Sequence, residues 1–125
     1  MAEGDMTNPE PAERPGRLSA VSTTMEGIRV LTLTGEIDHH TGNRFQQALF
    51  FSDAACPRVV VDMSGVTFMD STGINILITA HRILSEAGGW LRLTAAGGSV
   101  KRTMHIVGLD TILDCRETLH EALST

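Results

Sequence analysis

The sequence predicts a single α/β domain built on a mixed, mostly parallel β-sheet, and three observations support this. The chain has 125 residues, an ordinary length for one domain. An unbroken β-branched run at Val59–Val61 is typical of a strand that is buried on both faces. Apolar residues at helical spacing follow Ser71, and strand-like and helix-like segments alternate in the order β-β-α-β-α-β-α-β-α. This alternation predicts crossover helices that join parallel strands.

Residues 1–17 are expected to form a disordered tail, and residues 18–125 the folded domain. The tail holds three of the four prolines and four acidic residues, with almost no large apolar side chain. Two strands, 18–25 and 28–34, follow the tail. The short turn at Glu26–Gly27 between them predicts an antiparallel pair.

The remaining elements alternate between helix and strand, and turn residues separate them. The expected order is a helix over 43–51 capped by Thr41 or Asp38, a strand over 58–63, a helix from Ser71 to Gly88–Gly89, a strand over 90–95, a helix over 99–107, a strand over 111–114 and a terminal helix that begins at Thr118.

Composition narrows the class of partner and the compartment. The formal net charge is −5 and the basic residues are scattered, which argues against binding to a nucleic-acid backbone. The sequence has no 18-residue apolar run and no secretory signal, so we expect a cytoplasmic protein that makes no membrane contact. Cys56 and Cys115 are expected to be neutral thiols, and a redox pair between them is the alternative.

The segment Phe68–Ile74 is the strongest candidate for a functional site. It places Asp70, Ser71 and Thr72 where a strand passes into a helix. Unpaired N–H groups and the helix dipole favour an anion at such a point, so Ser71 is a plausible place to add a phosphate. The alternative is that Ser71 only caps the helix.

The helix after Ser71 predicts a core face and a contact face. The expected core residues share one side, and the expected solvated residues lie opposite. The two sets are Ile76, Leu77, Ala80, Ile83, Leu84 and Ala87 for the core, and Asn75, Thr79, Arg82 and Glu86 for the solvent. Ile74 and Ile78 lie between these sets, where they either contact a partner or widen the core stripe.

A second polar cluster precedes the first predicted helix. It follows a strand that is expected to end near the start of the Ser71 helix, and it consists of Glu36, Asp38, His39 and His40. Contact with a partner is the functional interpretation, and a helix cap is the alternative for Asp38. A metal site is disfavoured because adjacent histidines point in different directions and no third ligand is evident. No metal and no cofactor are expected.

Three short motifs carry a resemblance to a known family. They are Leu33-Thr34-Gly35-Glu36-Ile37-Asp38, Phe68-Met69-Asp70-Ser71-Thr72-Gly73-Ile74, and Val100-Lys101-Arg102-Thr103-Met104 followed by Val107-Gly108-Leu109. In this order and spacing, the chain resembles the bacterial anti-sigma factor antagonists, which are stand-alone STAS domains. The resemblance covers residues 18–125. Many members have a glycine where this chain has Asn75, which bears on how closely a partner approaches.

The resemblance implies partner switching. The unphosphorylated antagonist would bind an anti-sigma factor that is also a serine kinase, and so free a sigma factor. Phosphorylation of Ser71, with Thr72 as the weaker candidate, would release it, and a serine phosphatase would reset it. The partner surface implied by the motifs comprises Glu36, Asp38, His39, His40, Asp70, Thr72, Gly73, Ile74 and Ile78.

Other functions are less well supported by the sequence. No Gly-x-Ser-x-Gly elbow, phosphate-cradling loop or second carboxylate dyad is present, so no catalysis is expected. Nucleotide binding ranks low because no glycine-rich loop follows a strand. The main alternative is a STAS subunit that acts as an interaction module in a stress-sensing or transport complex. The isolated chain is expected to be a monomer.

Overall fold

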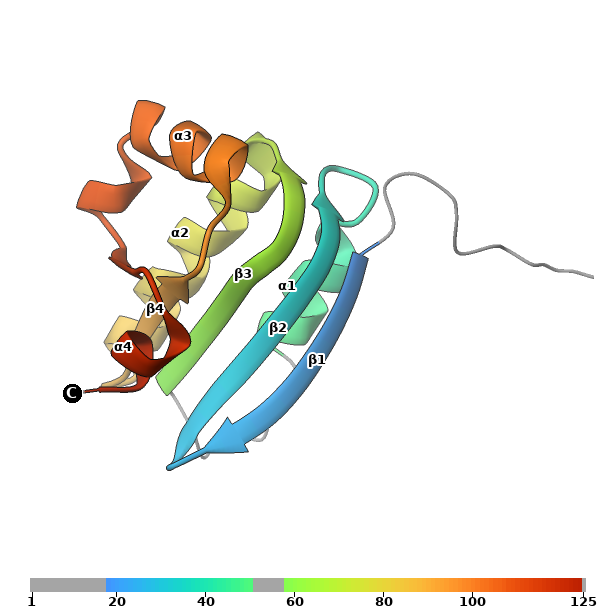
Figure 1. The fold of residues 1–125 in the computed structure, drawn as a ribbon. Coiled ribbons are helices and arrows are strands. Elements are labelled where there is room, and N and C mark those ends of the chain that lie inside the picture. Colours follow the sequence, from blue (N-terminus) through green and yellow to red (C-terminus); the bar gives the residue numbers. More distant parts are fainter. Residues whose placement is uncertain (1–17, 51–57, 125) are drawn as a thin grey trace, which may run out of the picture.

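A computed structural model describes residues 18–50 and 58–124. Five strands form one sheet in the order β1-β2-β3-β4-β5 (Figure 1). β1 is antiparallel to β2, and every other neighbouring pair is parallel, as the sequence predicted. The strands are β1 (Leu18–Met25), β2 (Ile28–Ile37), β3 (Arg58–Met69), β4 (Trp90–Thr94) and β5 (Asp114–Arg116).

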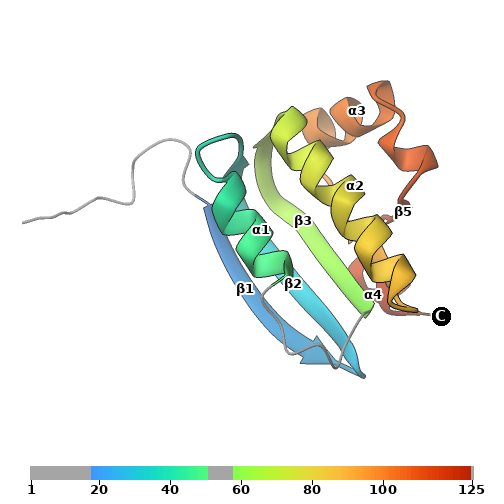
Figure 2. The ribbon, with the colours of Figure 1, turned by 180° about the vertical axis from the view of Figure 1, so that it is seen from behind.

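The buried side chains form two core clusters that involve different helices. Figure 2 shows α1 and α2 lying together across one face of the sheet. Buried side chains of α1, α2 and α3 share the larger core cluster with this face, whereas Ala122 of α4 belongs to a smaller cluster with Ile28, Val30 and Val60. The helices are α1 (Gly42–Phe50), α2 (Ser71–Glu86), α3 (Gly98–Ile106) and α4 (Leu119–Leu123), with a 3-10 turn η1 at Leu109–Thr111.

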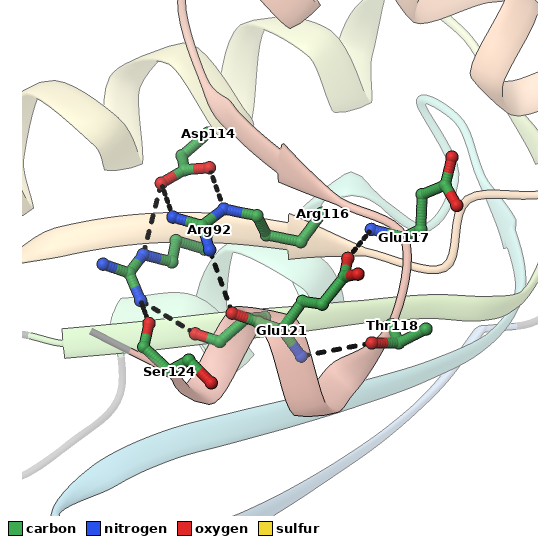
Figure 3. A network of polar contacts seen from close by, with 8 residues as sticks. Arg92, Asp114, Arg116, Glu117, Thr118, Glu121 and Ser124 are labelled. Atoms are coloured by element: carbon green, nitrogen blue, oxygen red, sulfur yellow. Dashed lines mark hydrogen bonds and ion pairs between the residues drawn. The ribbon is translucent and has the colours of Figure 1, made fainter.

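Two arginines tie helices to the sheet through backbone carbonyls. Arg29 of β2 is buried and donates to the carbonyl oxygens of Ala48 and Leu49 at the end of α1. Arg92 of β4 donates to the carbonyl oxygens of Ala122 (2.9 Å) and Ser124 (2.8 Å) (Figure 3). Cations suit these positions because carbonyls at the end of a helix lack intrahelical partners.

The helix predicted to begin at Thr118 is present and is capped as its sequence suggests. The Thr118 hydroxyl accepts from the Glu121 N–H (3.1 Å), and the Glu121 carboxylate accepts from the Glu117 N–H (3.2 Å). Arg116 donates to the Glu121 carbonyl oxygen and forms a two-pronged ion pair with Asp114 (Figure 3).

The last strand was predicted at the wrong place. Residues 109–111 form η1, and β5 begins only at Asp114. The reason is that Leu109 and Leu113 are both buried, and the Leu113 N–H donates to the Leu109 carbonyl oxygen (2.9 Å). A helical turn places side chains four residues apart on one side, whereas the sequence pattern was interpreted with strand spacing. Gly108 permits the turn with a left-handed φ of 77°.

The predicted core face of α2 was partly wrong. Leu77 and Ala80 are fully buried, but Ile83 is 44% exposed and Ala87 is exposed. At about 100° per residue, Ile83 lies about 120° from Leu77 around the helix, which puts it at the rim of the stripe. Ile74 lies only about 60° from Leu77 and is buried at 8% exposure. The buried stripe is therefore narrower and rotated toward Ile74.

Some expectations fall on residues outside those described. They concern the tail over 1–17, the last residue of the first predicted helix at Phe51, and Cys56.

Candidate functional site: the start of α2

Asp70, rather than Ser71, caps α2. Asp70 has extended backbone angles, and its carboxylate accepts from the Thr72 N–H (2.9 Å). Ser71 is the first helical residue and its side chain is exposed. Because Asp70 provides the cap, the hydroxyl of Ser71 is not needed for it and is presented to solvent beside the free N–H groups of the first turn.

The neighbouring hydroxyl of Thr72 is in a different environment. Thr72 is half-buried, and its methyl carbon lies only 2.8 Å from the point where a Cβ on Gly42 would stand. Thr72 therefore packs against the first residue of α1. Of the two hydroxyls, Ser71 is the more accessible to an enzyme.

Gly73 allows α2 to approach the sheet closely. A Cβ at Gly73 would lie 2.6 Å from Cγ of Met69 and 2.7 Å from Cγ2 of Ile37. No ordinary side chain fits there without a shift of the strand ends. Because Gly73 is buried, its direct role is to position the start of α2, not to offer a surface to a partner.

The loop between β2 and α1 lies beside the start of α2, as the parallel topology predicted. The Asp70 N–H donates to the Ile37 carbonyl oxygen (3.1 Å), which joins the end of β3 to the end of β2. Phe68 and Met69 are in register with Glu36 and Ile37. These contacts place the end of β2 beside the end of β3, directly before the first residue of α2.

Asp38 orders that loop. Its carboxylate accepts from the backbone N–H groups of His40 (2.9 Å) and Thr41 (3.1 Å). The Thr41 hydroxyl donates to the Glu36 carbonyl oxygen (2.9 Å) and accepts from the Asp38 N–H (2.9 Å). Thr41 also accepts, through its carbonyl, the Phe45 N–H of the first turn of α1 (3.1 Å). The two residues predicted as alternative caps thus have different roles. Asp38 orders the loop, and Thr41 accepts the first hydrogen bond of α1.

The acidity of Asp38 follows from these contacts. Desolvation acts to raise its pKa, but the N–H donors of His40 and Thr41, together with the positive potential of His40 and His39, oppose it and leave the pKa lowered. The carboxylate is therefore ionised at neutral pH. Glu36 and Asp70 are the other acidic residues of this region.

His39 and His40 are exposed at the tip of the loop, with ring centroids 3.9 Å apart. Within residues 18–50 and 58–124, no three His, Cys, Asp or Glu side chains gather where they could hold a metal ion. The two histidines are therefore available as surface contacts.

The two isoleucines of α2 are separated by the structure. Ile74 belongs to the main core cluster, so for this residue the core alternative is correct. Ile78 is half-buried and packs against the same cluster, which leaves part of its side chain at the surface.

Phe68 was not singled out from the sequence as a surface residue. Phe68 is 46% exposed and pairs in register with Glu36 at the end of the sheet. Simple strand alternation would not have found it, because Val66 and Met69 are both buried and the pairing with β2 shifts register between Gly35 and Glu36. An exposed aromatic ring three residues before Ser71 is suited to a protein contact.

Cys115 lies on β5, which β4 separates from β3, so it is not part of this site. Cys115 is a free thiol. Burial, with Asp110 and Asp114 nearby, raises its pKa, so it is neutral at pH 7. In the described part of the chain, no helix has the length and apolar character needed to cross a bilayer.

Comparison with known proteins places the chain in a family. Residues 19–122 match the STAS domain model. The chain is 30% identical to the anti-sigma-F factor antagonist RsfB of Mycobacterium tuberculosis, over 88% of this chain and 90% of the relative. It is 26% identical to an anti-sigma F factor antagonist of Paenibacillus polymyxa, over 78% of this chain and 86% of the relative.

Comparison with solved structures supports the same family. An anti-sigma factor antagonist from Mycobacterium paratuberculosis superposes with a TM-score of 0.80 at 31% identity, covering 88% of this chain and 94% of the other. The anti-sigma factor antagonist SpoIIAA in its unphosphorylated form superposes with a TM-score of 0.68 at 23% identity, over 84% of this chain and 93% of the other, which is a likeness of fold. By its sequence match and its fold, the chain belongs to the STAS domain family.

Proposed function

We propose that this chain is an anti-sigma factor antagonist that is controlled by phosphorylation of Ser71. In the unphosphorylated form it binds an anti-sigma factor with serine kinase activity and so frees a sigma factor. A serine phosphatase restores the binding form. The single observation that carries the proposal is the exposed hydroxyl of Ser71 at the start of α2, beside a cap that Asp70 supplies. The names of the relatives support the same role.

The charge of the site explains how a phosphate would act as a switch. A phosphoserine adds about −1.5 to −2 charges at neutral pH. The helix N-terminus offsets this by up to about 2 kcal/mol. In a complex, the phosphate must be desolvated next to Asp70 and the ionised Asp38. Losing a buried charged contact commonly costs about 2–5 kcal/mol, so the balance favours dissociation.

The proposed docking surface surrounds Ser71. It combines the acidic loop with the exposed rings of His39 and His40, and with Phe68 as an apolar anchor. Gly73 and Ile74 support this surface from below, because both are buried. Such a mixture of one aromatic residue and a polar rim is typical of transient protein interfaces.

The proposal is tested by incubating the purified chain with its anti-sigma kinase and ATP, followed by mass spectrometry of the phosphopeptides. We expect one phosphate on the peptide that contains Ser71, and none in Ser71→Ala. Thr67→Ala is the matched control, because it removes another exposed hydroxyl at the end of β3. Phosphate on Thr72 or on a distant residue in the wild-type chain would contradict the assignment.

A further inference from the structure

The two edges of the sheet are protected very differently. β5 has three residues, two of them charged, and the Arg116–Asp114 ion pair lies along it (Figure 3). β1 has eight residues, Leu-Ser-Ala-Val-Ser-Thr-Thr-Met, with no charge and no proline. Natural edge strands are usually short, charged, bulged or interrupted by proline, because exposed backbone groups recruit other strands. β5 follows this rule and β1 does not.

β1 is also regular and open. All eight of its residues pair in unbroken register with β2, so no bulge twists the edge away. Every residue over 21–25 is exposed, and Val21 and Met25 are the most prominent apolar ones at 55% and 42%. Among the described residues, β1 pairs with β2 alone, which leaves the outer row of backbone N–H and C=O groups available.

We propose that β1 pairs antiparallel with β1 of a second copy of this chain, which joins two sheets into one continuous sheet. The occupant follows from the chemistry of the strand. A twofold axis places identical strands antiparallel, so each copy satisfies the backbone groups that the other exposes. The chain carries a net charge of −5, yet β1 has no charged residue, so like charges do not oppose each other along this seam.

The side chains of β1 suit such a pairing. A register centred on Val21 places Val21 opposite Val21 of the second copy. A register centred on Ser22 places Val21 opposite Thr23 of the second copy. Cross-strand pairs of β-branched residues are stabilising in antiparallel sheets. The monomer expected from the sequence did not take this edge into account.

The proposed seam is separate from the start of α2. β2 lies between β1 and β3, and Ser71 follows the end of β3. Dimerisation would leave Ser71 accessible, so the inference stands or falls independently of the phosphorylation proposal.

The experiment is sedimentation equilibrium of the full chain from about 10 μM to about 1 mM, the range in which small interfaces associate. The test variants are Val21→Lys and Thr23→Lys, which add the charge that natural edges carry. Ser85→Lys, on the exposed side of α2, is the matched control because it adds the same charge elsewhere. Circular dichroism verifies that all three variants are folded.

We expect a concentration-dependent dimer whose Kd rises at least about tenfold in each β1 variant and is unchanged in Ser85→Lys. Amide hydrogen exchange over residues 18–25 should slow as the concentration of the protein rises. A monomer throughout the range, or a dimer that tolerates lysine at both positions, would overturn the proposal. Protection of the outward-facing amides of β1 that does not depend on concentration would also overturn it, because it would assign the edge to a segment of the same chain.

Discussion

Replacing Gly73 by alanine would force the start of α2 away from the ends of β2 and β3. The new Cβ would stand 2.6 Å from Cγ of Met69 and 2.7 Å from Cγ2 of Ile37, well inside contact distance. Met69 can rotate, but Ile37 is β-branched, fully buried and held in β2, so relief requires a backbone shift. Overpacking of this kind costs about 1–3 kcal/mol, and alanine returns up to about 1 kcal/mol through helix propensity.

We therefore expect Gly73→Ala to lower the free energy of unfolding by about 1–2 kcal/mol, measured by urea titration. Gly98→Ala is the matched control, because Gly98 begins α3 and a Cβ there meets nothing within 4 Å. That variant should be neutral or more stable by up to about 1 kcal/mol. Equal stability of Gly73→Ala and the wild type would refute the close-packing argument for this glycine.

Three further predictions concern the switch, its anchor and the response of the fold to acid. Ser71→Asp should weaken binding to the anti-sigma factor, whereas Ser71→Ala should bind and resist release by ATP; equal affinities in a titration would count against the charge mechanism. Phe68→Ala should weaken the same complex at least about tenfold with little change in the urea midpoint, because the ring is 46% exposed. Hydrogen bonding and charge from Arg116, with a smaller effect of Arg92, lower the pKa of Asp114, so its stabilising contribution is complete above the unfolded pKa and is lost as pH falls through the folded value below 3.8. Asp114→Asn should therefore flatten the acid limb of the stability curve, by less than about 1 kcal/mol since the pair is solvent-screened; an unchanged acid limb would contradict it.

The element order was predictable because it depends on local patterns. Alternating apolar residues, glycine turns and helical spacing each act over a few residues, so the hairpin and the crossover units were found correctly. Parallel topology then sufficed to bring the loop at Asp38 to the start of α2, since adjacent parallel strands end at the same edge.

The errors lie where tertiary packing decides. Residues 109–111 were predicted to include the start of a strand, but the burial of both Leu109 and Leu113 favours a helical turn. The exposure of Ile83 depends on which side of α2 meets the sheet, and helical spacing alone does not define that side when apolar residues surround much of the helix. Asp70 could be recognised as a polar residue before a helix, but not as the residue that frees the hydroxyl of Ser71 from capping.

The short C-terminal helix has a practical consequence for handling this protein. Five residues are too few to form a stable helix in isolation. α4 is held in place because Arg92 and Arg116 donate hydrogen bonds to its carbonyl oxygens and Ala122 packs against the sheet. Arg92 also donates a hydrogen bond to the carbonyl oxygen of Ser124, just beyond the helix. An affinity tag fused directly after that residue would strain these hydrogen bonds. Detachment of α4 would expose the apolar side chains of Ile28, Val30 and Val60, which would favour aggregation and proteolysis. Purification handles are better attached ahead of β1, through a flexible spacer.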